Sequence, residues 1–158
     1  MRVGLGYDSH RLEAGRKFII GGVEIPFEKG LMGHSDADVL AHAITDALLG
    51  AAALGNIGQH FPDTDPEYKD ADSLRLLKAS LNMVEDAGYR LVNLDATIIA
   101  QAPKLNPHID TIRGSLADCL DVPAGAISVK AKTGEGVGPE GRGESVSVHA
   151  VVLIEKTA

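Results

Sequence analysis

The sequence predicts an α+β domain in which a four-stranded mixed sheet carries helices on one face. Extended segments with alternating polar and apolar residues are interleaved with helical segments along the chain, an order that favours a sheet covered by helices. The chain has 158 residues, of which 44% are hydrophobic and 23% are charged. Since this size and composition are typical of one globular domain, residues 1–158 are expected to form a single unit without a linker.

Two alternating segments begin the chain. Residues 1–12 and 16–25 are expected to be strands, and the intervening turn Glu13-Ala14-Gly15 predicts that they pair as a hairpin. Residues 28–37 are polar and contain glycine and histidine, so they are expected to form a loop.

An alanine-rich helix is expected next, from Asp36 to Leu54, with Ser35 or Asp36 as its N-cap. The segment from Gly55 to Lys69 is expected to be a long loop. Loops of this length in a compact domain are usually functional or mobile.

Helices and strands alternate in the second half of the chain. The expected elements are a helix over Asp72–Ala87 that stops at Gly88, a strand over Tyr89–Gln101 ended by Pro103, a helix over Pro107–Leu120 with Asn106 as N-cap, and strands over Ala126–Thr133 and Glu144–Lys156. No helix remains to cover the second face of the sheet, so this face is expected to pack in an oligomer.

Composition excludes several classes of protein. The net charge of −7 and a pI near 5.3 argue against a nucleic-acid binder. The chain lacks the run of about eighteen apolar residues that a membrane span needs, and its N-terminus does not have the pattern of a signal peptide. Cys119 is the single cysteine, which excludes an internal disulfide and favours a cytoplasmic location.

The strongest candidate for chemistry is a pair of residues near the start of the chain. Asp8 and His10 are two apart on an expected strand, so their side chains share one face. His42, on the expected helix, could complete a set of two imidazoles and one carboxylate. Three such ligands leave the fourth position of a zinc-like ion open, as in catalytic sites. The alternative is a surface aspartate beside a half-buried histidine.

Other polar residues could serve the same site. Asp38 and Asp46 lie one turn on either side of His42 and could orient its ring, or they could belong to a solvated helix face. His34 and Ser35 precede the helix, where backbone amides favour anions, although Ser35 could equally be a simple cap.

Two further segments have the composition of a nucleotide site. The loop over 100–105 follows an apolar strand and could hydrogen-bond a flat ligand such as a nucleobase. The segment over 130–135 offers lysines and a threonine for phosphate and Glu135 for a hard cation such as Mg²⁺. Arg142 lies between glycines, as a guanidinium presented to an anion would.

Taken together, the motifs resemble the 2-C-methyl-D-erythritol 2,4-cyclodiphosphate synthases of the non-mevalonate isoprenoid pathway. The matching stretches occur in the family's order over the whole chain: Gly6–His10, Ile20–Pro26, Gly33–Val39, His42–Gly50, Phe61–Asp65, Ala100–Lys104 and Gly141–Glu144. Departures from the family pattern are Leu5, Asn56, Lys132, Gly134 and Pro139.

The resemblance implies a role for each matching residue. Asp8, His10 and His42 would bind Zn²⁺, and Glu135 would hold Mg²⁺ or Mn²⁺. His34 and Thr133 would stabilise the transition state. The substrate contacts would come from Ser35, Asp46, Asn56, Ile57, Gly58, Phe61, Pro62, Asp63, Thr64, Asp65, Ala100, Gln101, Ala102, Pro103, Lys104, Leu105, Asn106, Lys132, Gly134, Pro139 and Arg142.

The resemblance also implies a reaction and an assembly. The enzyme, a phosphorus–oxygen lyase, would convert 4-diphosphocytidyl-2-C-methyl-D-erythritol 2-phosphate to the cyclic diphosphate and CMP. It would be a homotrimer with active sites between subunits and an axial cavity near Arg142 that can hold an isoprenoid diphosphate. Two alternatives stay open: a zinc-dependent nucleoside-diphosphate hydrolase and a non-catalytic trimer that binds an isoprenoid diphosphate.

Overall fold

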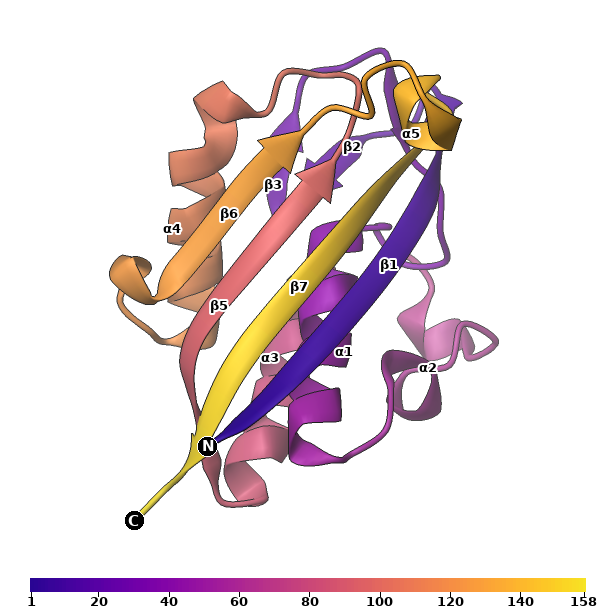
Figure 1. Cartoon of the computed structure of the whole chain (residues 1–158). Coiled ribbons are helices and arrows are strands. Elements are labelled where there is room, and N and C mark those ends of the chain that lie inside the picture. Colours follow the sequence, from indigo (N-terminus) through magenta and orange to yellow (C-terminus); the bar gives the residue numbers. More distant parts are fainter.

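Five strands form one curved sheet in the order β4-β1-β7-β5-β6 (Figure 1). In that order they are Lys29–Leu31, Arg2–Ala14, Ser145–Lys156, Tyr89–Ile99 and Ile127–Lys132. β5 and β6 run parallel and the other neighbours are antiparallel, so the sheet is mixed as expected. The expected number of four strands is wrong. The additional strand, β4, lies within the segment predicted to be a loop, because three residues are too few to show an alternating pattern.

Three helices cover one face of this sheet, as expected: α1 (Val39–Ala52), α3 (Ser73–Asp86) and α4 (Ile109–Leu120) (Figure 1). The computed structural model describes residues 1–158, and the buried apolar side chains of the sheet and helices form its core. The opposite face of the sheet is uncovered in the single chain and exposes Val3, Leu5, Tyr7 and Val151. No helix is long and apolar enough to cross a membrane.

The expected hairpin between residues 1–12 and 16–25 is wrong. The second segment forms its own small sheet from β2 (Phe18–Ile20) and β3 (Val23–Ile25). The reason is a tight turn at Gly21 and Gly22, which have φ angles of 57° and 75°. Glycine adopts this left-handed region with little steric cost, so the segment reverses there and pairs with itself.

Asp38 is the N-cap of α1, so the expected caps Ser35 and Asp36 are wrong. Its fully buried carboxylate accepts N–H bonds from Ala41 at 3.0 Å, Gly21 at 2.9 Å and Gly22 at 2.7 Å. One side chain therefore ties the start of α1 to the β2–β3 turn. It also holds together the two ends of the segment over 23–37, which contains His34 and Ser35.

The segment from Gly55 to Lys69, expected to be a long loop, contains the short helix α2 (Ile57–His60) and the 3₁₀ helix η1 (Pro66–Tyr68). Another short helix, α5 (Gly138–Gly141), lies between β6 and β7, and the 3₁₀ turns η2 (Asn106–His108) and η3 (Ala124–Ala126) flank α4. Asn106 is inside η2 and does not cap α4, which starts without a side-chain cap. Proline at the next position favours a 3₁₀ turn, which begins three residues before the helix proper.

Helix α1 lies unusually close to strand β1. A Cβ atom on Gly6 would be 1.8 Å from the carbonyl oxygen of Ala43, and one on Gly4 would be 1.9 Å from that of Ala47. Only a residue without a Cβ allows this approach. As a consequence, the first turns of α1 lie directly beside the part of β1 that contains Asp8 and His10.

Candidate functional site

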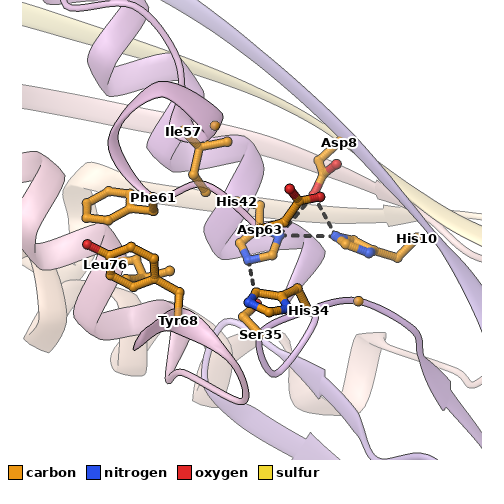
Figure 2. A pocket seen from close by; sticks show the side chains of 12 residues that line it. Asp8, His10, His34, Ser35, His42, Ile57, Phe61, Asp63, Tyr68 and Leu76 are labelled. Atoms are coloured by element: carbon orange, nitrogen blue, oxygen red, sulfur yellow. Dashed lines mark hydrogen bonds and ion pairs between the residues drawn. The ribbon is translucent and has the colours of Figure 1, made fainter. Parts of the chain in front are cut away.

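Asp8, His10 and His42 converge at the contact between β1 and α1 (Figure 2). Asp8 Oδ2 lies 2.8 Å from His10 Nε2 and 3.1 Å from His42 Nδ1, and the two ring nitrogens are 3.1 Å apart. All three residues are partly buried and offer one ligand atom each to the same point. Two imidazoles and a carboxylate suit a Zn²⁺-like ion with one coordination position left open.

The other ring nitrogens of the two histidines have partners of their own. His10 Nδ1 is 2.8 Å from the carbonyl oxygen of Met32. Since a carbonyl only accepts, this nitrogen carries a proton and Nε2 faces the triad. His42 Nε2 lies 2.9 Å from Ser73 Oγ and 3.0 Å from Ser35 Oγ.

The predicted role of Asp38 and Asp46 in orienting His42 is wrong. The Asp38 carboxylate is occupied by the three backbone N–H groups described above. Asp46 Oδ1 accepts the N–H of Ile57 at 2.7 Å. Asp46 therefore fixes the start of α2 on α1. The alternative of a solvated helix face is also wrong for Asp38, which has no exposed surface.

The pKa values of Asp8 and His10 shift in opposite directions. Burial raises the pKa of Asp8, but hydrogen bonds from His10 and His42, donated when the ring nitrogens that face it carry protons, outweigh this effect and hold the pKa of this carboxyl well below its ordinary value of 3.8. Burial lowers the pKa of His10, but the hydrogen bond to Asp8 outweighs it and raises this pKa above its ordinary value of 6.5. The site thus favours a negative charge on Asp8 beside a positive charge. A bound cation could supply that positive charge in place of the histidine proton.

A cavity of about 350 Å³ opens directly onto the triad. Figure 2 shows His34 and Ser35 at one side of it and the apolar side chains at the other. The cavity brings together His34, expected to stabilise the transition state, and five of the residues expected to contact substrate: Ser35, Ile57, Gly58, Phe61 and Asp63. The His34 ring is held by a hydrogen bond between its Nε2 and the carbonyl oxygen of Asp65, at 3.1 Å.

Sequence reasoning missed three residues of this cavity: Gly33, Tyr68 and Leu76. Phe61 and Tyr68 pack edge to face with ring centroids 5.5 Å apart and form part of an apolar wall. No local motif marks Tyr68 or Leu76, since they come from η1 and α3 and meet only in the fold. Asn56, expected to contact substrate, lines neither cavity of the single chain and caps α2, where its side chain accepts the N–H of Gln59 at 3.1 Å.

A second cavity, of about 380 Å³, contains most of the predicted nucleotide-binding residues. It lies between the loop after β5 and the end of β6, and is lined by Ala100, Gln101, Pro103, Lys104, Leu105, Asn106, Pro107, Ala131, Lys132 and Thr133. It shares no lining residue with the cavity at the triad. In one chain, therefore, the predicted site residues line two different cavities.

Of the other predicted residues, Gly134, Glu135, Pro139 and Arg142 lie in the glycine-rich segment between β6 and β7. Pro62, Thr64, Asp65 and Ala102 line neither cavity. Thr133 Oγ1 donates to Glu135 Oε1 at 2.8 Å, and both residues are exposed. Glu135 is not part of the Asp8–His10–His42 cluster. Arg142, expected to be presented to an anion, pairs with Glu144, with Nε 2.8 Å from Oε1.

Comparisons with known proteins agree over the whole chain. The model of the YgbB family matches residues 1–155. A protein of Chloroherpeton thalassium named 2-C-methyl-D-erythritol 2,4-cyclodiphosphate synthase is 60% identical over 99% of both chains. A protein of Syntrophomonas wolfei with the same name is 58% identical, also over 99% of both chains.

Solved structures show the same fold. A 2C-methyl-D-erythritol-2,4-cyclodiphosphate synthase described as the CDP-bound form superposes with a TM-score of 0.90 at 40% identity, covering 98% of this chain and all (100%) of its own. The bifunctional IspDF from Campylobacter jejuni superposes with a TM-score of 0.96 at 41% identity. That match covers 99% of this chain but 42% of the longer bifunctional one.

Proposed function

The chain belongs to the YgbB family, and from that premise we propose that it is a 2-C-methyl-D-erythritol 2,4-cyclodiphosphate synthase, a phosphorus–oxygen lyase. It converts 4-diphosphocytidyl-2-C-methyl-D-erythritol 2-phosphate to the cyclic diphosphate and CMP, within the non-mevalonate isoprenoid pathway. The observation that carries this proposal is the Asp8–His10–His42 cluster facing a cavity, in a chain whose named relatives match end to end.

The metal assignment follows from the donor set. Asp8 Oδ2, His10 Nε2 and His42 Nδ1 would hold Zn²⁺, because their mutual distances place one ligand atom of each at a common point. A zinc ion held there would supply a Lewis acid beside the substrate diphosphate. Glu135 would hold Mg²⁺ or Mn²⁺, which carboxylate oxygens bind well.

The protein needs no nucleophile of its own. The 2-phosphate of the substrate attacks the β-phosphorus, the bond from that phosphorus to the CMP oxygen breaks, and CMP leaves with the electron pair. The residues therefore act by folding the substrate and by neutralising charge, which can lower such a barrier by roughly 7–11 kcal/mol. In this scheme His34 and Ser35 hold phosphate, Thr133 stabilises the transition state, and Ile57, Phe61 and Asp63 surround the erythritol part.

We also propose a homotrimer with the active site between subunits. The two cavities share no lining residue within one chain. In the proposed trimer, the cavity between the loop after β5 and the end of β6 of a neighbouring subunit would lie next to the triad cavity and would bind the cytidine. The uncovered apolar face of the sheet provides the surface for this assembly. Binding of an isoprenoid diphosphate near Arg142 would require Glu144 to release the guanidinium, and Pro139 contributes no aromatic surface there.

Phosphorus NMR of the purified protein with the diphosphocytidyl substrate, Zn²⁺ and Mg²⁺ tests the function directly. We expect CMP to appear together with a cyclic diphosphate. CMP with an uncyclised product would indicate the hydrolase instead. Absence of turnover in the zinc-loaded protein would contradict both enzymatic functions.

Removal of one metal ligand tests the role of the cluster. His42→Ala should abolish turnover and leave the fold largely intact, because His42 is only partly buried. The same NMR assay measures turnover, and circular dichroism checks the fold. His108→Ala is the matched control, since His108 lines neither cavity. Full activity of His42→Ala would rule out the metal assignment.

A further inference from the structure

Ser73, which no sequence motif singled out, lies at the centre of a buried hydrogen-bond network behind His42. It is the first residue of α3 and has no exposed surface. Its Oγ is 2.9 Å from His42 Nε2 and 3.2 Å from Ser35 Oγ, and it donates a short hydrogen bond to Asp36 Oδ1. The network thus joins α3 to the imidazole that faces the metal cluster.

The direction of these hydrogen bonds follows from the surroundings of Asp36. Its Oδ1 accepts the N–H of Asp38 at 3.1 Å, and its Oδ2 accepts the N–H of Ser73 at 3.1 Å. Both oxygens therefore act as acceptors, so the Ser73 hydroxyl proton points to Asp36. A hydroxyl has one proton, so towards His42 the Ser73 oxygen can only accept.

This direction selects the tautomer of His42. If Ser73 Oγ accepts, its hydrogen bond to His42 requires the proton on Nε2, and in the neutral ring the lone pair of Nδ1 then points to Asp8 and His10. Ser35 Oγ, 3.0 Å from the same nitrogen, can accept that proton as well. Asp8 favours the other tautomer, because its Oδ2 lies 3.1 Å from Nδ1 and a carboxylate attracts the proton to the ring nitrogen nearest to it. The Asp36–Ser73 pair counteracts this effect.

We propose that Ser73, fixed by Asp36, is a positioning residue that holds His42 in the Nε2-protonated tautomer and so prepares Nδ1 as a metal ligand. This inference rests on the proposed metal centre at Asp8, His10 and His42. Mutation of a residue that hydrogen-bonds the second nitrogen of a metal-bound histidine typically weakens metal binding by about 10- to 100-fold.

Zinc affinity, measured by competition with a chromophoric chelator, tests the proposal without an activity assay. Ser73→Ala should weaken zinc binding by about 10- to 100-fold. The control is Ser80→Ala on the same helix, which removes a buried hydroxyl whose only partner is the Leu76 carbonyl, at 3.0 Å. Ser80→Ala should bind zinc like the unchanged protein. Equal affinity of Ser73→Ala and Ser80→Ala would overturn the proposal.

Nitrogen NMR of the imidazoles in the metal-free, unchanged protein provides a second measurement that needs no variant. At alkaline pH we expect the His42 signals of an Nε2-protonated ring, whereas a ring protonated at Nδ1 would overturn the proposal. If the unchanged protein binds no zinc, the metal centre itself is wrong. If it binds zinc and forms the cyclic product while Ser73→Ala binds equally well, only the role of Ser73 is wrong.

Discussion

His10 has different partners on its two ring nitrogens, and this asymmetry turns Nε2 towards Asp8 and His42. Nδ1 is next to the Met32 carbonyl and Nε2 is next to Asp8, both at 2.8 Å. In the metal-free protein the hydrogen bond to Asp8 overcomes the effect of burial and raises the pKa of His10 above 6.5. The raised pKa stabilises the fold below pH 6.5, and this stabilisation is lost as pH rises through the folded-state value.

Protons and metal should therefore compete for His10 Nε2. Because only the neutral imidazole can bind a metal, zinc affinity should already decline before the pH has fallen to 6.5, the ordinary pKa of histidine. Calorimetric titrations with zinc in buffers of different ionisation enthalpy would measure both the affinity and the protons released. A zinc affinity that stays constant while the pH falls through 6.5 would contradict this prediction.

Among the elements, the contact between β1 and α1 determines whether the cluster can form. Asp8 and His10 share one face of β1 because they are two residues apart, as the sequence indicated. His42 reaches them because Gly4 and Gly6 allow α1 to lie against the strand backbone. The two glycines thus allow the cluster to form, although neither contributes a ligand atom to it.

Substitution of one of these glycines should separate the two elements. In Gly6→Ala the new Cβ would be 1.8 Å from the Ala43 oxygen, so we expect a loss of at least about 3 kcal/mol in the free energy of unfolding, with weaker zinc binding. Urea denaturation and zinc titration would measure these effects. Gly114→Ala is the control: its Cβ would meet no atom within 4 Å, and in a helix it should stabilise by about 1 kcal/mol. Equal stability of the two variants would disprove the close-contact explanation.

The sequence predicted long elements well and short ones poorly. α3 spans Ser73–Asp86, close to the expected Asp72–Ala87, because its apolar residues recur with helical spacing and Asp72 and Gly88 flank it. β2, β3 and β4 have three residues each, too few to establish a period. Their pairing depends on the turn at Gly21 and Gly22 and on the neighbouring backbone.

For the whole molecule, the uncovered sheet face is the expected interface of the trimer. Leu5, which is 67% exposed, lies on this face beside Val151 of β7. Leu5→Lys would place a charge in the buried centre of the proposed interface. We therefore expect it to yield monomers in analytical ultracentrifugation and to lose activity, because each site would lack its second half.

A control on the helical side separates this effect from a general effect of charge. Asn82→Lys introduces the same side chain at an exposed position of α3, away from the sheet face, and should remain trimeric. If Leu5→Lys still sedimented as a trimer, the assembly would have to use a different surface.

The sequence by itself determined the candidate ligand set of Asp8, His10 and His42, the class of fold and the family, because these depend on spacing within an element and on motifs distributed along the whole chain. Only the tertiary structure decided which residues orient the ligands. Asp38 and Asp46 are neighbours of His42 on its helix but bind other backbone groups, whereas Ser73 and Asp36, 37 residues apart, meet behind its ring. A hydrogen bond depends on distance and direction in three dimensions, and the packing of α1, α3 and β1 sets both.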